Sequence, residues 1–261
     1  MSYLQFHLIF IIPPILLLAA GAPRIRARLG RRGFISLALI PPIALAYTTP
    51  WDNYLVYREI WWYGLDRVMG TIGYVPIEEY MFFILQPLLT GLFTLHVLAR
   101  RRGAEEAGLR SIPGLRLEPP LPTGWGPRIL TALPWFGLAA LGAWCLTMPS
   151  GLYMGLILAW AAPVIGFMWL FDGGRLWSYV HVMGLAVAIP TVYLWVADAV
   201  AIRLGIWEIS AEYTFGWNPF GLPVEEATFF LITNVLVVVG TMLFTLPGLP
   251  ESTRDPAGSG P

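Results

Sequence analysis

The stretch PIEEYMFF at residues 76–83 recurs as PVEEATFF at residues 223–230. Five of the eight positions are identical: both copies begin with proline and carry two adjacent glutamates followed by two phenylalanines. A second match lies upstream, where an aspartate stands nine residues before a tryptophan in each half, namely Asp52 before Trp61 and Asp198 before Trp207. Self-similarity of this kind is typical of a chain built from two copies of one unit.

The composition around this repeat is that of a membrane protein. Of the 261 residues, 57% are hydrophobic and only 12% are charged, with a formal net charge of zero. A soluble domain carries about 25% charged residues, and a nucleic-acid-binding domain is strongly basic. Both classes are therefore excluded, and we expect a polytopic protein surrounded by membrane lipid, with no nucleic-acid partner.

Seven apolar stretches approach the roughly 20 residues that a helix needs to cross a bilayer. They lie at about 3–22, 34–50, 77–99, 129–148, 151–171, 177–199 and 222–246. Alignment of the two motif copies leaves the fourth stretch as a linker, and an even offset of four spans gives the copies the same orientation. The predicted fold is all-α, with about seven transmembrane helices in a 3+1+3 arrangement of two parallel repeats.

The predicted organisation follows from these spans. Residues 1–100 form the first three-helix repeat, 101–150 a cytoplasmic loop and the linker helix, 151–246 the second repeat, and 247–261 a disordered tail rich in Pro, Gly and Ser. Thirteen of the 16 arginines fall in segments that seven spans place on one side. By the positive-inside rule this side is cytoplasmic. We expect an inner-membrane protein with its N-terminus outside and its C-terminus in the cytoplasm.

The repeated motif brings carboxyl groups into an apolar setting. A proline followed by two glutamates is also the ordinary start of a helix, because proline suits the first turn and acids complement the helix dipole. Carboxylates inside a membrane are costly and usually functional, however, and the motif occurs twice. Desolvation and a second carboxylate raise the pKa of such a group, so one member can stay protonated and act as a general acid.

Phenylalanine and tryptophan rings beside such an acid could stabilise a cation without attacking it. This combination suits carbocation chemistry on an apolar polyene. The sequence contains no P-loop, no aspartate-rich diphosphate motif and no GxGxxG turn after a strand, so nucleotide and flavin binding are not expected. His7, His96 and His181 show no metal-ligand spacing, and we expect no metal.

These residues resemble the non-flavin, integral-membrane lycopene beta-cyclases. That family occurs as two subunits in some bacteria, as a fused chain in others and in archaea, and as the cyclase half of fungal bifunctional enzymes. The resemblance rests on the paired motif, on TPWDN at residues 49–53, on IWWYG at residues 60–64 and on the span plan. It implies a redox-neutral isomerisation of lycopene or another acyclic carotenoid, in which acid-initiated cyclisation converts ψ ends into β-ionone rings. No cofactor is expected.

The resemblance also implies roles for particular residues. The acidic motif comprises Glu78, Glu79, Glu225 and Glu226, with Asp52 and Asp198 as orienting groups or as the accepting base. We prefer Glu78 and Glu225 as acid or base, because each is four residues from a phenylalanine and shares its helix face. Aromatic contacts to the substrate fall to Phe82, Phe83, Phe229, Phe230, Trp61 and Trp207. In the second half EIS replaces WYG, which leaves open whether both halves are catalytic.

Other functions fit parts of the pattern. A small 3+1+3 transporter would place polar groups near the membrane midplane, whereas these carboxylates lie at span ends. A carotenoid end-group hydratase would trap the same cation with water, and a carotenoid-binding subunit would need no acid. The sequence makes no prediction of oligomeric state.

Overall fold

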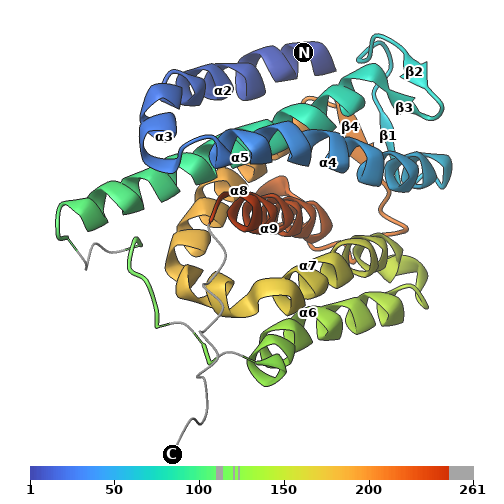
Figure 1. Ribbon diagram of the computed structural model, residues 1–261. Coiled ribbons are helices and arrows are strands. Elements are labelled where there is room, and N and C mark those ends of the chain that lie inside the picture. Colours follow the sequence, from blue (N-terminus) through green and yellow to red (C-terminus); the bar gives the residue numbers. More distant parts are fainter. Residues whose placement is uncertain (110–113, 120, 123, 247–261) are drawn as a thin grey trace, which may run out of the picture.

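The computed structural model of the protein describes residues 1–109, 114–119, 121–122 and 124–246, and it is built mainly of long helices (Figure 1). The predicted tail 247–261 and part of the predicted cytoplasmic loop lie outside the described residues. Six helices are long and apolar enough to cross a membrane. They are α4 (Arg32–Tyr57), α5 (Ile77–Glu106), α6 (Trp125–Cys145), α7 (Leu152–Ser178), α8 (Val180–Arg203) and α9 (Val224–Thr245).

A bent helical segment at the N-terminus supplies a further crossing. It consists of α1 (Tyr3–Phe6), the π-helix η1 (His7–Ile11), α2 (Ile12–Ala19) and α3 (Ala22–Leu29), with an angle of 52° before α3. Counted as one span, it brings the total to seven and confirms the predicted class of all-α polytopic membrane protein. In chain order, this segment, α4 and α5 precede α6, and α7, α8 and α9 follow it.

Helices α4, α5, α7 and α8 extend beyond the predicted apolar stretches. Helix α4 continues to Tyr57 in spite of Pro50, so Asp52 lies on a helix and not in a loop. Helix α5 continues to Glu106 through three arginines, because Arg, Ala and Glu all favour the helical state.

A side chain from another helix accommodates one of the prolines, Pro14. Pro14 lacks the N–H that would bond to the carbonyl of Phe10 in a regular helix. The hydroxyl of Tyr193 on α8 donates to this carbonyl at 2.7 Å. A freed backbone group inside the membrane is thereby satisfied by another helix.

Helices α5 and α9 form the centre of the bundle. Helix α9 contacts α4, α5, α7 and α8 (Figure 1). A buried polar network joins the two central helices: Gln86 Nε2 and Thr90 Oγ1 donate to Asn234 Oδ1 at 2.8 and 2.6 Å. Asn234 Nδ2 donates to Thr191 Oγ1 on α8 at 3.0 Å. Because lipid offers no hydrogen-bond partner, such a network holds helices together.

The linker helix α6 lies at the edge of the bundle, against α7 (Figure 1). Glycines make this contact close. A Cβ atom on Gly142 would lie 2.7 Å from the backbone nitrogen of Ala159, and one on Gly166 would lie 2.9 Å from the ring of Phe136. Small residues at a membrane helix interface allow the backbones to approach in this way.

Two short strands join the halves at the ends of α4 and α8. Strand β1 (Trp61–Tyr63) pairs antiparallel with β4 (Trp207–Ile209), and Tyr63 lies opposite Trp207. A second small hairpin consists of β2 (Thr71–Ile72) and β3 (Val75–Pro76). No strand was expected from the sequence. The repeated Ile-Trp segments therefore pair with each other across the two halves, next to the first turns of α5 and α9.

We predict that Asn234→Leu lowers the stability of the bundle by about 1–3 kcal/mol, because it leaves the buried hydroxyl of Thr90 without its acceptor and removes the shorter of the two hydrogen bonds that the amide of Gln86 donates. The measurement is thermal unfolding in detergent, followed by tryptophan fluorescence. Thr241→Val on the same helix is the matched control, since Thr241 Oγ1 is buried without a hydrogen-bond partner among the described residues. Equal effects of the two substitutions would contradict the role of the network.

Candidate active site

The first turns of α5 and α9 carry the repeated motif. Pro76 and Pro223 occupy the N-cap positions with extended backbone angles, and both glutamates of each pair lie in the first helical turn. The four glutamate side chains are buried, with at most 7% of their surface exposed. The motif therefore starts a helix and also places carboxyl groups inside the protein.

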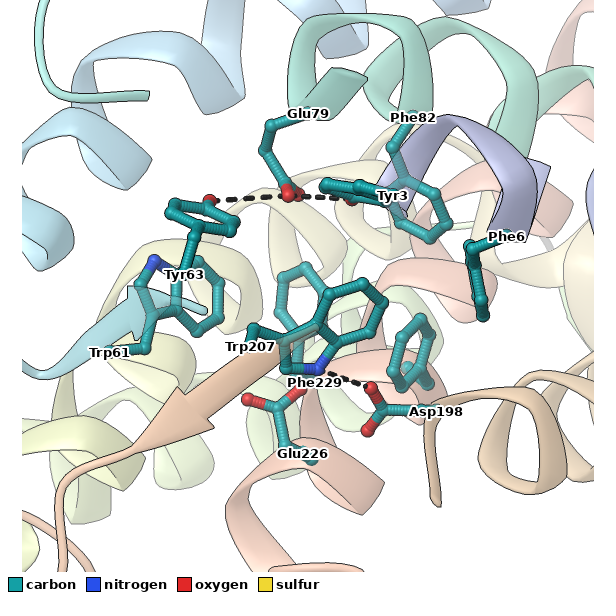
Figure 2. Close-up of a pocket in the computed structure, with 11 residues that line it drawn as sticks. Tyr3, Phe6, Trp61, Tyr63, Glu79, Phe82, Asp198, Trp207, Glu226 and Phe229 are labelled. Atoms are coloured by element: carbon teal, nitrogen blue, oxygen red, sulfur yellow. Dashed lines mark hydrogen bonds between the residues drawn. The ribbon is translucent and has the colours of Figure 1, made fainter. Parts of the chain in front are cut away.

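A small cavity of about 30 Å³ lies between these two helix starts and the β1–β4 pair. Figure 2 shows its acidic and aromatic side chains directed toward one another. Its lining consists of three acids and eight aromatic residues: Glu79, Asp198, Glu226, Tyr3, Phe6, Trp61, Tyr63, Phe82, Trp207, Phe229 and Phe230. None of these residues is basic. The acids thus meet one another and aromatic rings, without a lining residue that could act as a positive counter-ion.

Glu79 accepts hydrogen bonds from two tyrosines. The hydroxyl of Tyr3, from α1, donates to Glu79 Oε2 at 2.6 Å, and the hydroxyl of Tyr63, from β1, donates to the same atom at 3.2 Å (Figure 2). Burial raises the pKa of Tyr63 well above its usual value, and the charges of Glu79 and Asp52 add to this effect. Tyr63 therefore remains a hydroxyl donor.

Glu226 has one such partner, because Tyr153 on α7 donates to Glu226 Oε1 at 2.5 Å. Tyr3 and Tyr153 hold corresponding places in the two halves: the backbone N–H of Tyr3 donates to the carbonyl of Arg67, and that of Tyr153 donates to the carbonyl of Tyr213. Tyr3, Tyr63 and Tyr153 are not among the site residues predicted from the sequence. Tyr63 belongs to the quoted IWWYG segment, but no local pattern singles out the other two.

The two aspartates differ in their surroundings. Asp198 lines the cavity, and its Oδ1 accepts a hydrogen bond from Trp207 Nε1 at 2.9 Å (Figure 2). Asp52 is fully buried beside the cavity, and within the described residues neither of its carboxyl oxygens has a hydrogen-bond partner. The indole nitrogen of Trp61 is likewise unpaired there. The repeated Asp and Trp positions are thus bonded to each other in one half only.

Glu78 and Glu225 lie outside the cavity lining and bind backbone. Glu78 Oε1 accepts a hydrogen bond from the N–H of Met69 at 2.8 Å, and Glu225 Oε1 accepts one from the N–H of Phe215 at 2.8 Å. Each first glutamate therefore anchors the loop that precedes its helix. The sequence-based preference for these two residues as acid or base is not what the geometry favours, since the second glutamates face the cavity.

The predicted aromatic residues are divided between two spaces. Phe82, Phe229, Phe230, Trp61 and Trp207 line the acidic cavity. Phe83 lines a neighbouring apolar space instead. Trp51, from the TPWDN segment, stacks on the ring of Phe229 with centroids 5.6 Å apart. No group of three or more His, Cys, Asp or Glu in the described part of the chain could hold a metal ion.

This arrangement defines a class: an integral-membrane protein with a buried acidic and aromatic cavity suited to proton transfer on an apolar ligand. Comparison with known proteins is consistent with it. Two Halobacterium salinarum proteins, both called lycopene beta-cyclase, are 38% identical over 248 residues, which cover 93% of this chain and 95% of theirs. The chain belongs to the lycopene beta-cyclase family.

The fungal relatives are longer proteins. The bifunctional lycopene cyclase/phytoene synthase of Blakeslea trispora is 34% identical over 247 residues, which cover 92% of this chain and 38% of the fungal protein. The protein of the same name from Gibberella fujikuroi is 34% identical over 254 residues, 39% of its length. No protein-family profile matches the chain, and no solved structure matches it.

The two glutamates of the first motif should respond differently to substitution. Glu78→Ala removes the acceptor of the Met69 N–H, and we expect a loss of about 0.5–1.5 kcal/mol in stability. Glu79→Gln keeps the shape and an acceptor for the tyrosines while removing an uncompensated acid, so stability should be unchanged or higher. Thermal unfolding of both variants in detergent provides the measurement. A larger loss for Glu79→Gln would contradict these assignments.

Proposed function

We propose that this protein converts the linear ends of lycopene, or of another acyclic carotenoid, into β-ionone rings, giving γ-carotene and β-carotene. The cavity in which Glu79, Asp198 and Glu226 face aromatic rings carries this proposal, together with membership of the lycopene beta-cyclase family. The reaction is an isomerisation, so neither an oxidant nor a reductant is needed. We therefore expect no cofactor.

Each ring requires one proton to be added and one to be removed. An acid protonates the terminal double bond of the ψ end, which leaves a tertiary carbocation. The electron pair of an internal double bond then forms the new carbon–carbon bond and moves the positive charge into the ring. Loss of a proton from a neighbouring ring carbon restores a double bond. The product has the same composition as the substrate.

We assign proton donation to Glu226 and proton acceptance to Glu79. Hydrogen bonds donated to a carboxylate favour its charged form. Glu79 accepts two of them, from Tyr3 and Tyr63, whereas Glu226 accepts one, from Tyr153. The better-stabilised carboxylate is suited to the base and the other group to the acid.

The aromatic lining supplies stabilisation for the cation. A positive charge within about 6 Å of a tryptophan or phenylalanine ring is attracted by its electron-rich face. Trp207 is held against the cavity by its hydrogen bond to Asp198, and Phe229 by its stacking on Trp51. Because aromatic rings do not add to a carbocation readily, they stabilise it without trapping it. Water would trap it, so the aromatic side chains of the lining also have to keep water away from the cation.

We also propose that the protein lies in the cell inner membrane with its N-terminus outside. The arginine-rich segments then face the cytoplasm. In this orientation the acidic cavity lies near the outer ends of the spans, because it is built from the first turns of α5 and α9. The cavity is thus placed within the lipid layer in which a carotenoid dissolves.

Replacement of the cavity glutamates tests the assignment. In a lycopene-accumulating bacterial host, the intact protein should convert red lycopene to yellow-orange cyclic carotenes. Glu79→Gln and Glu226→Gln should each lower conversion by about 10²–10⁴-fold, because an amide cannot exchange the proton. Pigments are quantified by liquid chromatography, with the protein amount in the membrane measured in parallel.

Glu78→Gln and Glu225→Gln are the matched controls, since glutamine can still accept the backbone hydrogen bonds that these residues receive. Both controls should retain activity. Loss of activity in the controls but not in the cavity variants would overturn the assignment. Unchanged lycopene with the intact, membrane-inserted protein would overturn the proposed function itself.

Isotope incorporation tests the proton-transfer step. When membranes containing the protein act on lycopene in D₂O, each new ring should carry a deuteron from the acid, because the acid exchanges with solvent between turnovers. Mass spectrometry of the cyclic product provides the measurement. A product heavier by the mass of water would instead identify a hydratase, and a product without deuterium would exclude protonation by an exchangeable acid.

A further inference from the structure

A second, larger cavity of about 230 Å³ adjoins the acidic one. It lies between α4, α5, α7 and α9, and it shares two lining residues, Phe82 and Phe229, with the acidic cavity. The two spaces are therefore neighbours separated by these two rings. Rotation of the rings would join them into one path that ends at the carboxyl groups.

The walls of the larger cavity are apolar. Three of its polar side chains are already hydrogen-bonded: the amide of Gln86 donates to Asn234, the hydroxyl of Thr233 to the carbonyl of Phe229, and the hydroxyl of Tyr47 to the carbonyl of Trp160. The indole nitrogen of Trp160 has no hydrogen-bond partner among the described residues. Because no charged residue of the described chain lines the space and most of its lining is aliphatic or aromatic, it is suited to a hydrocarbon.

The cavity also reaches the lipid-facing surface of the bundle. Three of its lining residues are partly exposed there: Ile43 by 55%, Tyr47 by 40% and Phe244 by 42%. A cavity of this size is smaller than the roughly 300–1,000 Å³ of typical ligand sites. It can accept part of a long chain, and the remainder can extend between the helices into the membrane.

We infer that this cavity binds the polyene chain of the carotenoid while its end group reaches the carboxyl groups of the acidic cavity, whose volume of about 30 Å³ is enlarged by movement of Phe82 and Phe229. The inference rests on the proposed function. It assigns a binding site for the conjugated chain to α4, α5, α7 and α9, with entry from the lipid between α4 and α7. The rings of Phe82 and Phe229 lie between the two cavities, and they rotate to let the end group pass when the substrate enters.

The repeat supplies an internal comparison, because a related space of about 170 Å³ lies between α2, α5 and α8. Tyr193 in this smaller space corresponds to Tyr47 in the larger cavity. The hydroxyl of Tyr193 donates to the carbonyl of Phe10, and the hydroxyl of Tyr47 donates to the carbonyl of Trp160. The smaller space shares no lining residue with the acidic cavity. It therefore offers a hydrocarbon surface without access to the acids.

One substitution between the halves accounts for part of the difference. Gly240 lines the larger cavity, and the corresponding position in the first half, counted from the glutamate pairs, is Phe93, which lines the smaller space. A glycine leaves room where a phenylalanine fills it. Of these two spaces, only the larger shares lining residues with the acidic cavity.

Two variants at repeat-related positions test the site. Met168 lines the larger cavity and Leu18 lines the smaller one. We expect Met168→Phe to obstruct the polyene chain and lower lycopene conversion by about 10- to 100-fold, since misplacement of a substrate by about 1 Å has effects of this size. Leu18→Phe adds the same ring to the other space and should leave conversion unchanged. Conversion is normalised to the amount of folded protein in the membrane.

Gly240→Leu provides an independent variant that should fold well, because leucine has the higher helix propensity. It should also obstruct the cavity and lower lycopene conversion by about 10- to 100-fold. Equal activity of Met168→Phe and Leu18→Phe, or full activity of Gly240→Leu, would overturn the inference. An inactive unmodified protein would instead count against the proposed function, so the two failures are distinguishable.

Discussion

Five of the six buried carboxyl groups of the repeated motifs accept a hydrogen bond, and the architecture of the site follows from the elements that supply these donors. The starts of α5 and α9 bring Glu79 and Glu226 to one cavity, where the positive ends of the helix dipoles favour acidic groups. The remaining donors come from elsewhere in the chain: tyrosines from α1, β1 and α7, and a tryptophan from β4. The site exists only where all these elements meet, so the bundle, the short sheet and the cavity depend on one another.

The two halves use one scaffold with different side chains. Tyr63 donates to Glu79, but the corresponding residue in the second half is Ile209, which cannot donate. Trp207 bonds to Asp198, whereas Trp61 and Asp52 do not bond to each other. A duplicated frame therefore supports an asymmetric site. Asymmetry of this kind is what acid and base roles require, because one group must release a proton and another must take it up.

The positions of the helices could largely be predicted from the sequence, because apolar length decides which segments can cross a membrane. The repeat also predicted that the two motif copies have the same orientation, and the structure places both glutamate pairs at helix starts beside one cavity. Which glutamate of each pair faces the cavity could not be predicted from the sequence in this way. Adjacent residues on a helix point about 100° apart, and a sequence shows which residues share a face but not which face meets the cavity. Glu78 and Phe82 are four residues apart on α5, as predicted. The cavity, however, is lined by Phe82 and Glu79 and not by Glu78.

By itself, the amino-acid sequence determined that this is an all-helical membrane protein with a duplicated acidic motif, because hydropathy and self-similarity are properties of local sequence. Tertiary structure alone decided which acids face the cavity and which bind backbone. It also decided that Tyr3 and Tyr153 are the partners of Glu79 and Glu226, and that an apolar space lined in part by Phe82 and Phe229 adjoins the acids. These contacts join residues more than 70 positions apart. They arise from the packing of whole helices, which no local pattern encodes.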